Sequence, residues 1–340
     1  MLIILIEPSG QNNLLMSISK VKQVLVTGAN GFVGSALMPE LSSPGFDIVR
    51  LVRKKNYQDN LKIKTFYIDD LDNLGDLNEP LKDVDVVIHL AARVHVMDER
   101  RSDTLAEYRR TNVEATINLA RQAALSGIKR FVFLSSIKVN GELTKKDKPF
   151  RADDTSNPQD PYGISKCEAE AGLIKLAKET GMEVVIIRPP LIYGPGVKAN
   201  FLNMIKILHA GLPLPFGSIN NKRSLVFIGN LVDLIIKVID YPGVSGEIFL
   251  VSDDHDVSTS RLLNVLSLGL RGRKARLISL PESLLKIIFK VLGKSSLSDR
   301  LLGSLQLDIE KTKNKLDWVP PVTFDRGIKI TVDSYLNSVR

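Results

Sequence analysis

A tyrosine and a lysine four residues apart are the side chains best suited to do chemistry. Tyr162 and Lys166 follow Pro161, and residues at this spacing share one face of a helix. A phenol with a pKa near ~10 is a poor acid–base group at neutral pH, but a neighbouring ammonium stabilises the phenolate and lowers that pKa. Such a tyrosine can exchange a proton with a substrate hydroxyl while a hydride moves to or from a nicotinamide.

A pair of serines completes this candidate set. Ser135 and Ser136 follow a short apolar run at residues 130–134, one helix upstream of Tyr162. Of the seven tyrosines, only Tyr162 has a lysine four positions later. We therefore assign Ser136, Tyr162 and Lys166 as catalytic, with the Ser136 hydroxyl orienting the reacting carbon's oxygen.

A glycine triplet lies between the first predicted strand and the first predicted helix. Gly28 permits a tight turn, Gly31 lets the backbone approach a pyrophosphate, and Gly34 lets the helix pack closely on the strand. The helix N-terminus then faces the phosphates. This spacing predicts a dinucleotide site that also includes Asn30, Phe32 and Val33.

The end of the second predicted strand bears on the choice of cofactor. An acidic residue here usually binds the ribose 2′-hydroxyl of NAD, whereas an arginine favours the 2′-phosphate of NADP. This chain has Arg53, although an exposed basic strand end would look the same. Asp70 and Leu71, after the third strand, are placed to reach the adenine.

Short β-branched runs alternate with helical stretches from residue 21 to 188. The runs are apolar on both faces, as in a covered parallel sheet. The pattern predicts an α/β fold, with a Rossmann-type doubly wound parallel sheet and a smaller mixed α/β C-terminal substrate lobe. We expect strands at 23–26, 48–52, 62–68, 84–90, 130–134 and 184–187, and helices at 32–41, 74–81, 104–125 and 162–180.

The regular alternation of strands and helices ends after Arg188, which indicates a boundary between two lobes. We assign residues 21–195 and about 226–243 to the dinucleotide-binding domain, and 196–225 and 244–340 to the substrate lobe. Residues 1–20 form no regular pattern and are expected to be a disordered extension. Pro39 is expected to end the first helix early.

Composition excludes several classes of protein. The 340 residues are 44% hydrophobic and 25% charged, typical of a globular protein. The single cysteine, Cys167, argues against a disulfide framework or a cysteine zinc site and favours a cytoplasmic location. The net charge of +8 is spread along the chain, so we expect no nucleic acid partner. We also expect no membrane span.

Four further features have plain structural explanations. His89 ends a buried strand, and the Asp253–Asp256 run lies in a loop where capping explains its acids. Cys167 points about 100° away from Lys166 around the helix. The apolar stretch 284–292 could touch a membrane, but its helical spacing is more often that of a core helix. We therefore expect no metal.

The motifs together resemble the extended short-chain dehydrogenases/reductases of the NAD-dependent epimerase/dehydratase type, which act on nucleotide sugars. The similarity runs from about residue 22 to the C-terminus. It rests on the glycine loop, His89–Ala92, Thr111–Val113, Phe131–Ser136, Tyr162 with Lys166, Arg188–Pro189, Tyr193–Gly196 and Leu316–Pro320.

The resemblance implies further site residues. The cofactor, NADP(H) or NAD(H), would contact Leu90, Ala91, Ala92, Asn112, Ser135 and Pro189, together with Tyr162 and Lys166. The substrate, a UDP-sugar, would contact Ser136, Tyr162, Asn200 and Arg223. Two departures from the family pattern, Asn140 in place of a tyrosine and Gly229–Asn230 in place of an acidic pair, bear on sugar specificity. A homodimer is possible.

Three functions remain open at this point. Residues 89–97 and 135–141 are most similar to reductases of bacterial surface-polysaccharide pathways, which form UDP-N-acetylquinovosamine from a 4-keto-6-deoxy sugar for O-antigen or capsule synthesis. Arg53 also favours such net reduction by NADPH, so we place the reductase first. A UDP-glucose or UDP-N-acetylglucosamine 4-epimerase shares every catalytic residue. A non-catalytic nucleotide sensor would be expected to have lost some of them.

Overall fold

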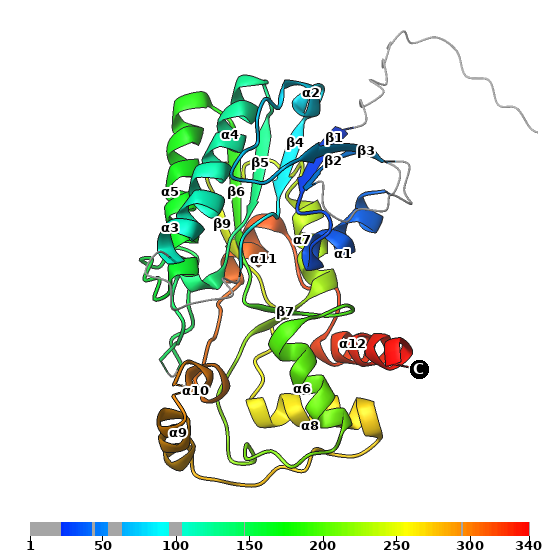
Figure 1. Ribbon diagram of the computed structural model, residues 1–340, viewed down its shortest axis with the longest axis vertical. Helices are drawn as coiled ribbons and strands as arrows, with labels where there is room; N and C mark the ends of the chain where they lie inside the picture. The colour runs from blue at the N-terminus through cyan, green and yellow to red at the C-terminus, as the bar shows by residue number, and fades with distance from the viewer. Residues whose placement is uncertain are drawn as a thin grey trace, which may run out of the picture.

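A computed structural model describes residues 22–42, 45–53, 63–94, 104–145, 147–293 and 295–339. Its larger part is a parallel sheet with helices on both faces, and its smaller part lies at one end of that sheet (Figure 1). The predicted N-terminal extension, residues 1–20, lies outside the described residues, as does His95.

The main sheet has seven parallel strands in the order β3-β2-β1-β4-β5-β6-β9. The chain first builds outward from β1 to β3 and then returns to the other side of β1 with β4. In such sheets a ligand binds beyond the carboxyl ends of the strands, where the order reverses. The strands are β1 (Lys22–Thr27), β2 (Phe46–Arg53), β3 (Lys64–Ile68), β4 (Val86–His89), β5 (Arg130–Leu134), β6 (Glu183–Arg188) and β9 (Ile248–Leu250).

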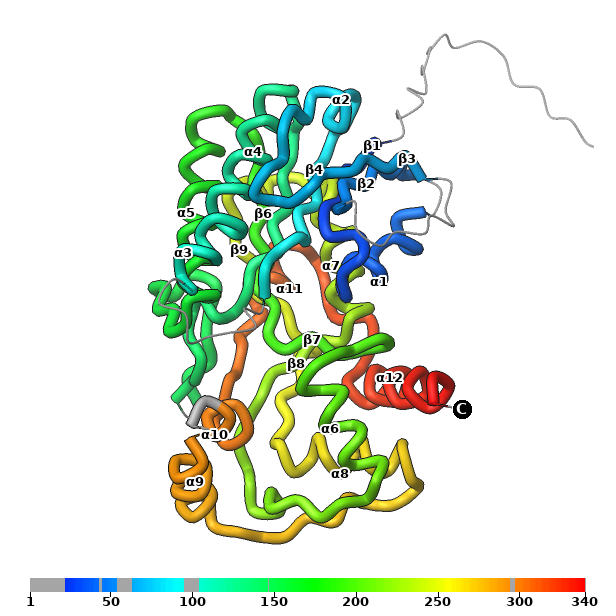
Figure 2. The backbone as a smooth tube through the Cα atoms, viewed as in Figure 1, coloured from blue at the N-terminus to red at the C-terminus, as the bar shows by residue number. Residues whose placement is uncertain are grey.

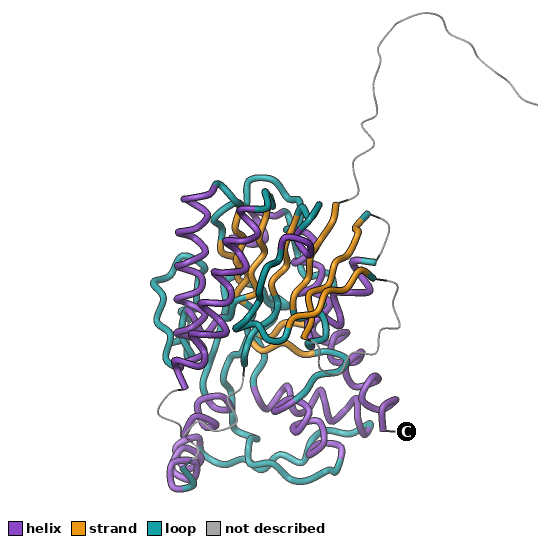
Figure 3. The backbone as a smooth tube through the Cα atoms, turned by 45° about the horizontal axis from the view of Figure 1, so that its top comes forward, coloured by secondary structure: helices purple, strands orange, loops and turns teal. Residues whose placement is uncertain are grey.

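Alternate residues of the strands pack into two separate hydrophobic cores, one on each face of the sheet. Val24 and Val26 of β1 pack with the helices on one face, α1 (Phe32–Leu41) and α7 (Ile228–Lys237). Leu25 faces the other side, toward α4 (Ala115–Leu125) and α5 (Pro161–Thr180). The two layers of helices stand on either side of the orange strands in Figure 3. Both faces are covered, which explains why the strands read as continuous apolar runs.

The helices on the α5 side include one irregular segment. The predicted helix 104–125 is divided into α3 (Thr104–Arg109), the π-helical turn Arg110–Glu114 and α4. The predicted helix 74–81 is shorter in the structure, where α2 covers only Asn78–Leu81. π-Turns often occur at functional positions, and this one contains Asn112.

Pro39 does not end α1, contrary to our expectation. The helix continues to Leu41 with Pro39 inside it. Met38 and Leu41 are both buried in the core, and this packing offsets the one backbone hydrogen bond that the proline ring removes. The Ser42 hydroxyl donates to the Met38 carbonyl at 2.9 Å and closes the helix end.

The smaller part contains a second sheet of two parallel strands. These are β7 (Leu191–Tyr193) and β8 (Leu225–Phe227). The tube in Figure 2 shows the later helices grouped around and below them. They are α6 (Ala199–His209), α8 (Thr259–Arg271), α9 (Glu282–Val291), α10 (Ser295–Leu302) and α12 (Phe324–Val339).

One predicted domain boundary needs correction. We placed residues 244–340 in the substrate lobe, but β9 pairs with β6 and forms the edge of the main sheet. The helix α11 (Glu310–Leu316) stays with it, since the Thr312 hydroxyl donates to the Leu250 carbonyl at 2.6 Å. The chain therefore returns to the first sheet twice, and the three-residue β9 was too short to reveal this by its pattern.

The expectation that 284–292 is a core segment is also wrong. Of α9, Leu285 is buried, but Leu284, Ile287, Ile288 and Val291 are exposed. Spacing alone indicates an amphipathic helix without showing what covers its apolar side. Within the described residues, none of the helices is long and apolar enough to cross a membrane.

Candidate active site

Two glycines of the loop after β1 are required by close packing. Gly28 has a φ of +71°, and a Cβ there would lie 2.7 Å from the Ala91 amide nitrogen. A Cβ at Gly34 would collide with the Gly28 carbonyl oxygen. Gly28 thus lets the loop after β4 approach, and Gly34 seats α1 on the strand, as the spacing predicted.

The surroundings of Gly31 are more open than those of Gly28 and Gly34. A Cβ there would meet only the Gly28 carbonyl oxygen, at 3.1 Å, and the residue is exposed. Gly31 precedes α1, and no side-chain hydrogen bond caps this helix end among the described residues. The free backbone N–H groups of the first turn, which begins with Phe32 and Val33, therefore suit an anion. This arrangement fits a dinucleotide pyrophosphate, and exposed Asn30 borders it.

The loop after β4 is held in place by side chains on both sides. The Leu90 and Ala91 amides donate to the backbone oxygen and hydroxyl of Thr27, both at 3.3 Å. The side chain of Asn112 accepts from the Arg93 amide at 2.8 Å and donates to its carbonyl at 3.1 Å. These bonds hold Leu90, Ala91 and Ala92 half-exposed beside the glycine loop.

Asn112 therefore has a positioning role that its sequence motif did not reveal. Its amide also donates to Ser165 at 3.0 Å, and Ser165 donates to the Tyr162 carbonyl at 2.8 Å. The π-turn thus links the cofactor-side loop to the first turn of α5. Its predicted contact with a cofactor is not tested by these bonds.

Tyr162 lies in the first turn of α5, whose start is fixed locally. The Asp160 side chain accepts from the Gly163 amide at 2.7 Å, and Pro161 occupies the first helical position. The ring of Tyr108 meets that of Tyr162 edge-on, with centroids 6.0 Å apart. Burial, Asp160 and Tyr108 raise the pKa of Tyr162, the opposite of the lowering that we expected from the adjacent lysine.

Lys166 lies one turn further along α5 and is almost fully buried. Its ammonium donates to the Leu134 carbonyl at 2.9 Å and lies 4.4 Å from the centre of the Phe133 ring. Burial lowers the pKa of Lys166 to about 7, while Glu170 acts in the opposite direction. Burial thus disfavours the charged form of Lys166, and the carboxylate of Glu170 favours it.

A buried ion pair beneath Lys166 was missed by sequence reasoning. The Arg188 guanidinium donates to both Glu170 carboxylate oxygens, at 2.9 and 2.5 Å. The Ser135 hydroxyl donates to the same carboxylate, and Arg188 also donates to Asn140 at 2.8 Å. Glu170 follows Lys166 by four residues, which was the available signal for a shared helix face.

This network explains one departure from the family pattern. Asn140 accepts from Arg188 and donates to the Arg151 carbonyl at 2.8 Å. It is therefore a buried structural residue. The Ser135 hydroxyl also donates a hydrogen bond within this network. The cofactor contact predicted for Ser135 would therefore be made by its backbone.

Ser136 is the second residue after β5 and remains half-exposed. Its hydroxyl oxygen accepts from the Lys138 amide at 3.3 Å, which leaves the hydroxyl hydrogen available. Pro189 supports the same turn, because its carbonyl accepts from the Ile137 amide at 3.0 Å. The structure thus brings β5, β6 and α5 together behind Ser136.

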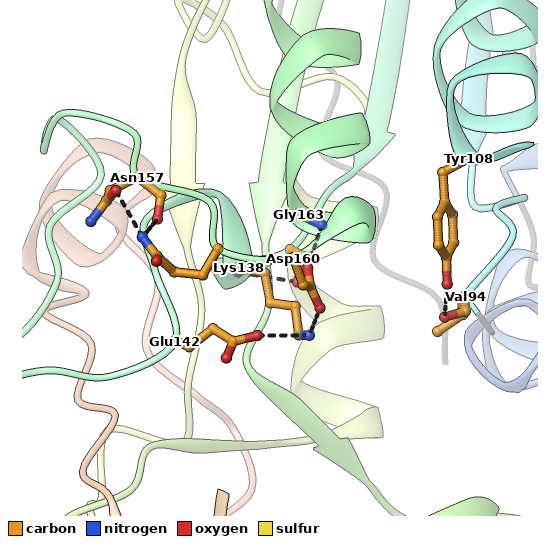
Figure 4. Close-up of polar contacts among 9 residues, drawn as sticks. Val94, Tyr108, Lys138, Glu142, Asn157, Asp160 and Gly163 are labelled. Atoms are coloured by element: carbon orange, nitrogen blue, oxygen red, sulfur yellow. Dashed lines mark hydrogen bonds and ion pairs between the residues drawn. The ribbon is translucent and has the colours of Figure 1, made fainter. Parts of the chain in front are cut away.

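A second ion cluster lies at the start of α5. Figure 4 shows the Lys138 ammonium between the carboxylates of Asp160 and Glu142. The same view shows Tyr108 with its hydroxyl directed at the Val94 carbonyl, 3.1 Å away. The Lys138 charge is thus neutralised locally, and the turn after Ser136 is tied to the cap of α5.

The predicted adenosine-binding residues meet at the ends of β2 and β3. Arg53 is exposed, and one of its guanidinium nitrogens lies 4.0 Å from an Asp70 carboxylate oxygen. Asp70 also accepts from the Leu71 amide at 2.7 Å. An anionic 2′-phosphate here would meet Arg53 beside an acidic neighbour, so the charge of this edge is mixed.

The two predicted substrate residues lie on the smaller lobe. Asn200 is exposed in the first turn of α6. Arg223 precedes β8 and donates to the Gly303 carbonyl at 3.0 Å. Burial and the nearby charge of Arg300 lower the pKa of Arg223 to about 10. Arg300, on α10, was not predicted, and its charge is close enough to disfavour the charged form of Arg223.

The remaining candidates have structural roles. His89 is buried between Thr27, at 2.7 Å, and Thr116, at 3.0 Å. Asp253 accepts from Tyr193 and Asn230, both at 2.7 Å, which also accounts for Asn230 in place of an acid. No group of metal-binding side chains occurs among the described residues.

The family model for the NAD dependent epimerase/dehydratase family matches residues 24–252. The chain belongs to this family. Its cofactor is therefore a nicotinamide dinucleotide, as we predicted, and the glycine loop described above fits it.

Two individual relatives are similar to the chain over most of its length. The chain is 47% identical over 320 residues to a UDP-glucose 4-epimerase of Vibrio cholerae, covering 93% of this chain and 96% of that one. It is 28% identical to a 4-epimerase of Escherichia coli O157:H7 that acts on N-acetylglucosaminyl-diphospho-undecaprenol, covering 91% and 94%.

A solved structure shows the same fold. The UDP-glucuronic acid 4-epimerase of Bacillus cereus in complex with NAD superposes with a TM-score of 0.75 at 22% identity, covering 94% of this chain and 100% of that one. The Rossmann-type prediction is confirmed by this likeness and by the seven-stranded sheet.

Proposed function

We propose that this family member is a UDP-sugar 4-epimerase. The observation that carries the proposal is the 47% identity to a UDP-glucose 4-epimerase over nearly the full length of both chains. Ser136, Tyr162 and Lys166 are all present at the carboxyl end of the sheet. Our first expectation was a 4-ketoreductase, and the epimerase, which we had placed second, is better supported by these relatives.

The side chains fit the proton transfers of this reaction. Tyr162 accepts the proton of the sugar 4-hydroxyl, and the Ser136 hydroxyl donates to the same oxygen and orients it. Lys166 stabilises, through its charge, the phenolate form of Tyr162 that accepts this proton. When bound, the oxidised nicotinamide supplies a hydride acceptor for C4 and a positive charge near the phenol.

The smaller lobe fits the other end of the substrate. Arg223 and Arg300 hold the diphosphate, and Asn200 lies in the neighbouring turn of α6. Because these contacts anchor the nucleotide, the 4-keto sugar can turn over and present its other face. Tyr162 then returns its proton to the oxygen as hydride returns to carbon. The net reaction inverts C4 and consumes no cofactor.

The turn after Ser136, residues 137–141, contains no acidic residue, which disfavours a dehydratase. That reaction requires an acid and a base beside the serine to remove water from the sugar. Here Ile137 is buried and Lys138 is neutralised by Asp160 and Glu142. The position next to Ser136 therefore supplies no free carboxylate.

A 4-ketoreductase remains the second candidate because of Arg53. No acid occupies that strand end, which favours NADPH and a cofactor that exchanges at each turnover. We also propose that the protein acts in O-antigen or capsule synthesis, that it is cytoplasmic and that it forms a homodimer.

The two candidates separate in one assay of the purified protein. UDP-glucose and UDP-N-acetylglucosamine are each incubated without added cofactor, and proton NMR follows the C4 epimer. A parallel sample receives UDP-4-keto-6-deoxy-N-acetylglucosamine with NADPH. Epimer formation in the first arm supports the epimerase. Stoichiometric NADPH oxidation in the second, without epimers in the first, would establish the reductase instead.

A further inference from the structure

The helix α9 presents an apolar surface that the rest of the described chain leaves exposed. Ile287 is 59% exposed, Val291 81% and Leu292 61%, and Leu284 and Ile288 lie beside them. Isolated apolar residues on a surface are ordinary, but a contiguous group on one helix marks an interaction site. We call these five residues the α9 face.

The arrangement of side chains around α9 is that of a helix lying in an interface. At about 100° per residue the α9 face spans an arc of about 140°. Leu285 points to the side and is buried in the core, so it anchors the helix to the protein. Lys290 lies about 60° beyond one edge of the α9 face, where its long chain can reach outward, and Lys286 lies on the opposite side of the helix.

The charge around the α9 face is strongly basic. The segment from Arg271 to Leu292 contains six basic residues and one acid, Glu282, which pairs with Lys286 at 2.7 Å. The segment before the helix carries exposed Arg273, Lys274 and Arg276. Figure 2 shows this segment running along the end of the molecule farthest from the main sheet, into α9. The basic residues and the apolar face therefore lie at the same extremity.

We propose that the α9 face docks on the surface of an anionic lipid bilayer. Exposed apolar side chains and neighbouring basic residues are the two features by which an interfacial helix binds, through burial at the acyl boundary and attraction to anionic headgroups. The +8 net charge of the chain adds to this attraction. A second copy of the chain would bring like charges together at the same place, so charge favours the lipid surface.

Docking through α9 orients the substrate lobe. The helix packs against α10, which carries Arg300 beside Arg223. The proposed diphosphate contacts therefore lie one helix away from the α9 face. Membrane binding is independent of the epimerase proposal, since α9 contributes no side chain to the active site described above.

Vesicle sedimentation with the full chain tests the proposal. Vesicles of phosphatidylcholine alone are compared with vesicles that contain phosphatidylglycerol as well, at low and high salt. The wild-type protein is expected to sediment with the anionic vesicles and to be released by salt, because screening weakens the headgroup attraction. A protein that stays in the supernatant with anionic vesicles at low salt overturns the proposal.

Paired variants locate the contact. Ile287→Asp is expected to weaken vesicle binding at least about tenfold, because a charge replaces an inserted side chain. Lys290→Gln should weaken it about fivefold, and only for anionic vesicles. Leu125→Asp is the control, since Leu125 is 83% exposed at the end of α4, on the other lobe. Equal binding by Ile287→Asp and wild type would contradict the proposal.

Sedimentation velocity tests whether a second copy of the chain, and not a lipid surface, covers the α9 face. If Ile287→Asp converts a dimer into a monomer and the wild type does not bind vesicles, the α9 face is an interface between copies and the lipid proposal is wrong. Circular dichroism confirms that each variant is folded, and the sugar assay reports separately on the epimerase proposal.

Discussion

The inner face of α5 and the outer edges of the site differ in how firmly their residues are held. Lys166 and Glu170 are buried, and each makes hydrogen bonds to a neighbouring strand or to a residue on one. Arg53 and Asn200 are exposed at a strand end and a helix start. In the proposed mechanism, the reaction therefore depends on residues fixed by the fold. The choice of cofactor and sugar would depend on residues that substitution can change without disturbing the core.

Removing the phenol of Tyr162 should have the largest effect. Tyr162→Phe is expected to lower kcat by about 10²–10⁴-fold, the usual contribution of a general acid–base group. Cofactor affinity should change little, because the ring is retained. Steady-state kinetics and cofactor titration measure both, with Tyr67→Phe on the exposed strand β3 as control. Normal turnover by Tyr162→Phe would remove Tyr162 from the mechanism.

Breaking the buried pair should affect stability and the pH profile together. Glu170→Gln leaves the Arg188 cation without its counter-charge, and such a loss costs about 3–5 kcal/mol of unfolding free energy. Glu170 also raises the pKa of Lys166, so the variant should lose the protonated lysine at lower pH.

Urea unfolding and the pH dependence of kcat/KM test these two effects. The alkaline limb of the profile is expected to shift to lower pH in Glu170→Gln. Glu168→Gln, on the exposed side of the same helix, is the matched control. An unshifted limb in a folded Glu170→Gln protein would mean that Glu170 does not tune Lys166.

A substitution of Arg53 tests whether the exposed edge of the site selects the cofactor. Arg53→Asp should shift preference from NADPH toward NADH by about 1–3 kcal/mol, because a charge-assisted phosphate contact is replaced by repulsion. Stability and kcat with the preferred cofactor should be nearly unchanged. Titration of both cofactors checks this, with Lys64→Asp on β3 as a charge control. An unchanged ratio would leave Arg53 as a solvated strand end.

His89 is a buried titratable group outside the chemistry, and its replacement should have the smallest effect on catalysis. Burial, and then the charge of Lys166, lower the pKa of His89 from 6.5 to about 3. The unfolded chain binds a proton below pH ~6.5 that the folded protein excludes. Its stability contribution is therefore complete above that pH and is lost as the pH falls toward 3, by at most about 1.4 kcal/mol per pH unit.

The slope of unfolding free energy against pH measures this directly. His89→Gln should flatten the slope between pH 6 and 4, roughly the window set by these two pKa values. His209→Gln, at an exposed position, serves as the control. An identical slope in His89→Gln and wild type would show that His89 is protonated in the folded protein.

The sequence predicted those parts that depend on local signals. The bounds of α1 and β5 match, and α5 begins one residue before its predicted start, where Asp160 and Pro161 form a standard helix beginning. The glycine spacing located the loop that packs against Ala91. The family and its cofactor followed from these motifs and were confirmed.

Contacts between distant segments could not be predicted in this way. Arg188 and Glu170 belong to different elements and meet only because β6 lies beneath α5. The charge of Arg300 acts on Arg223 although the two residues are 77 positions apart in the chain. The exposure of α9 was missed for the same reason, because periodicity describes a helix's faces without naming their neighbours.

Following the hydrogen at C4 tests the central claim most directly. A UDP-sugar carrying deuterium at C4 is incubated with the protein in ordinary water without added cofactor, and the epimer is analysed by NMR and mass spectrometry. An epimerase that holds one nicotinamide returns the same hydride, so the product should retain the deuterium at C4 without net formation of reduced cofactor. An epimer that carries protium at C4, or no epimer from UDP-glucose or UDP-N-acetylglucosamine, would contradict the account.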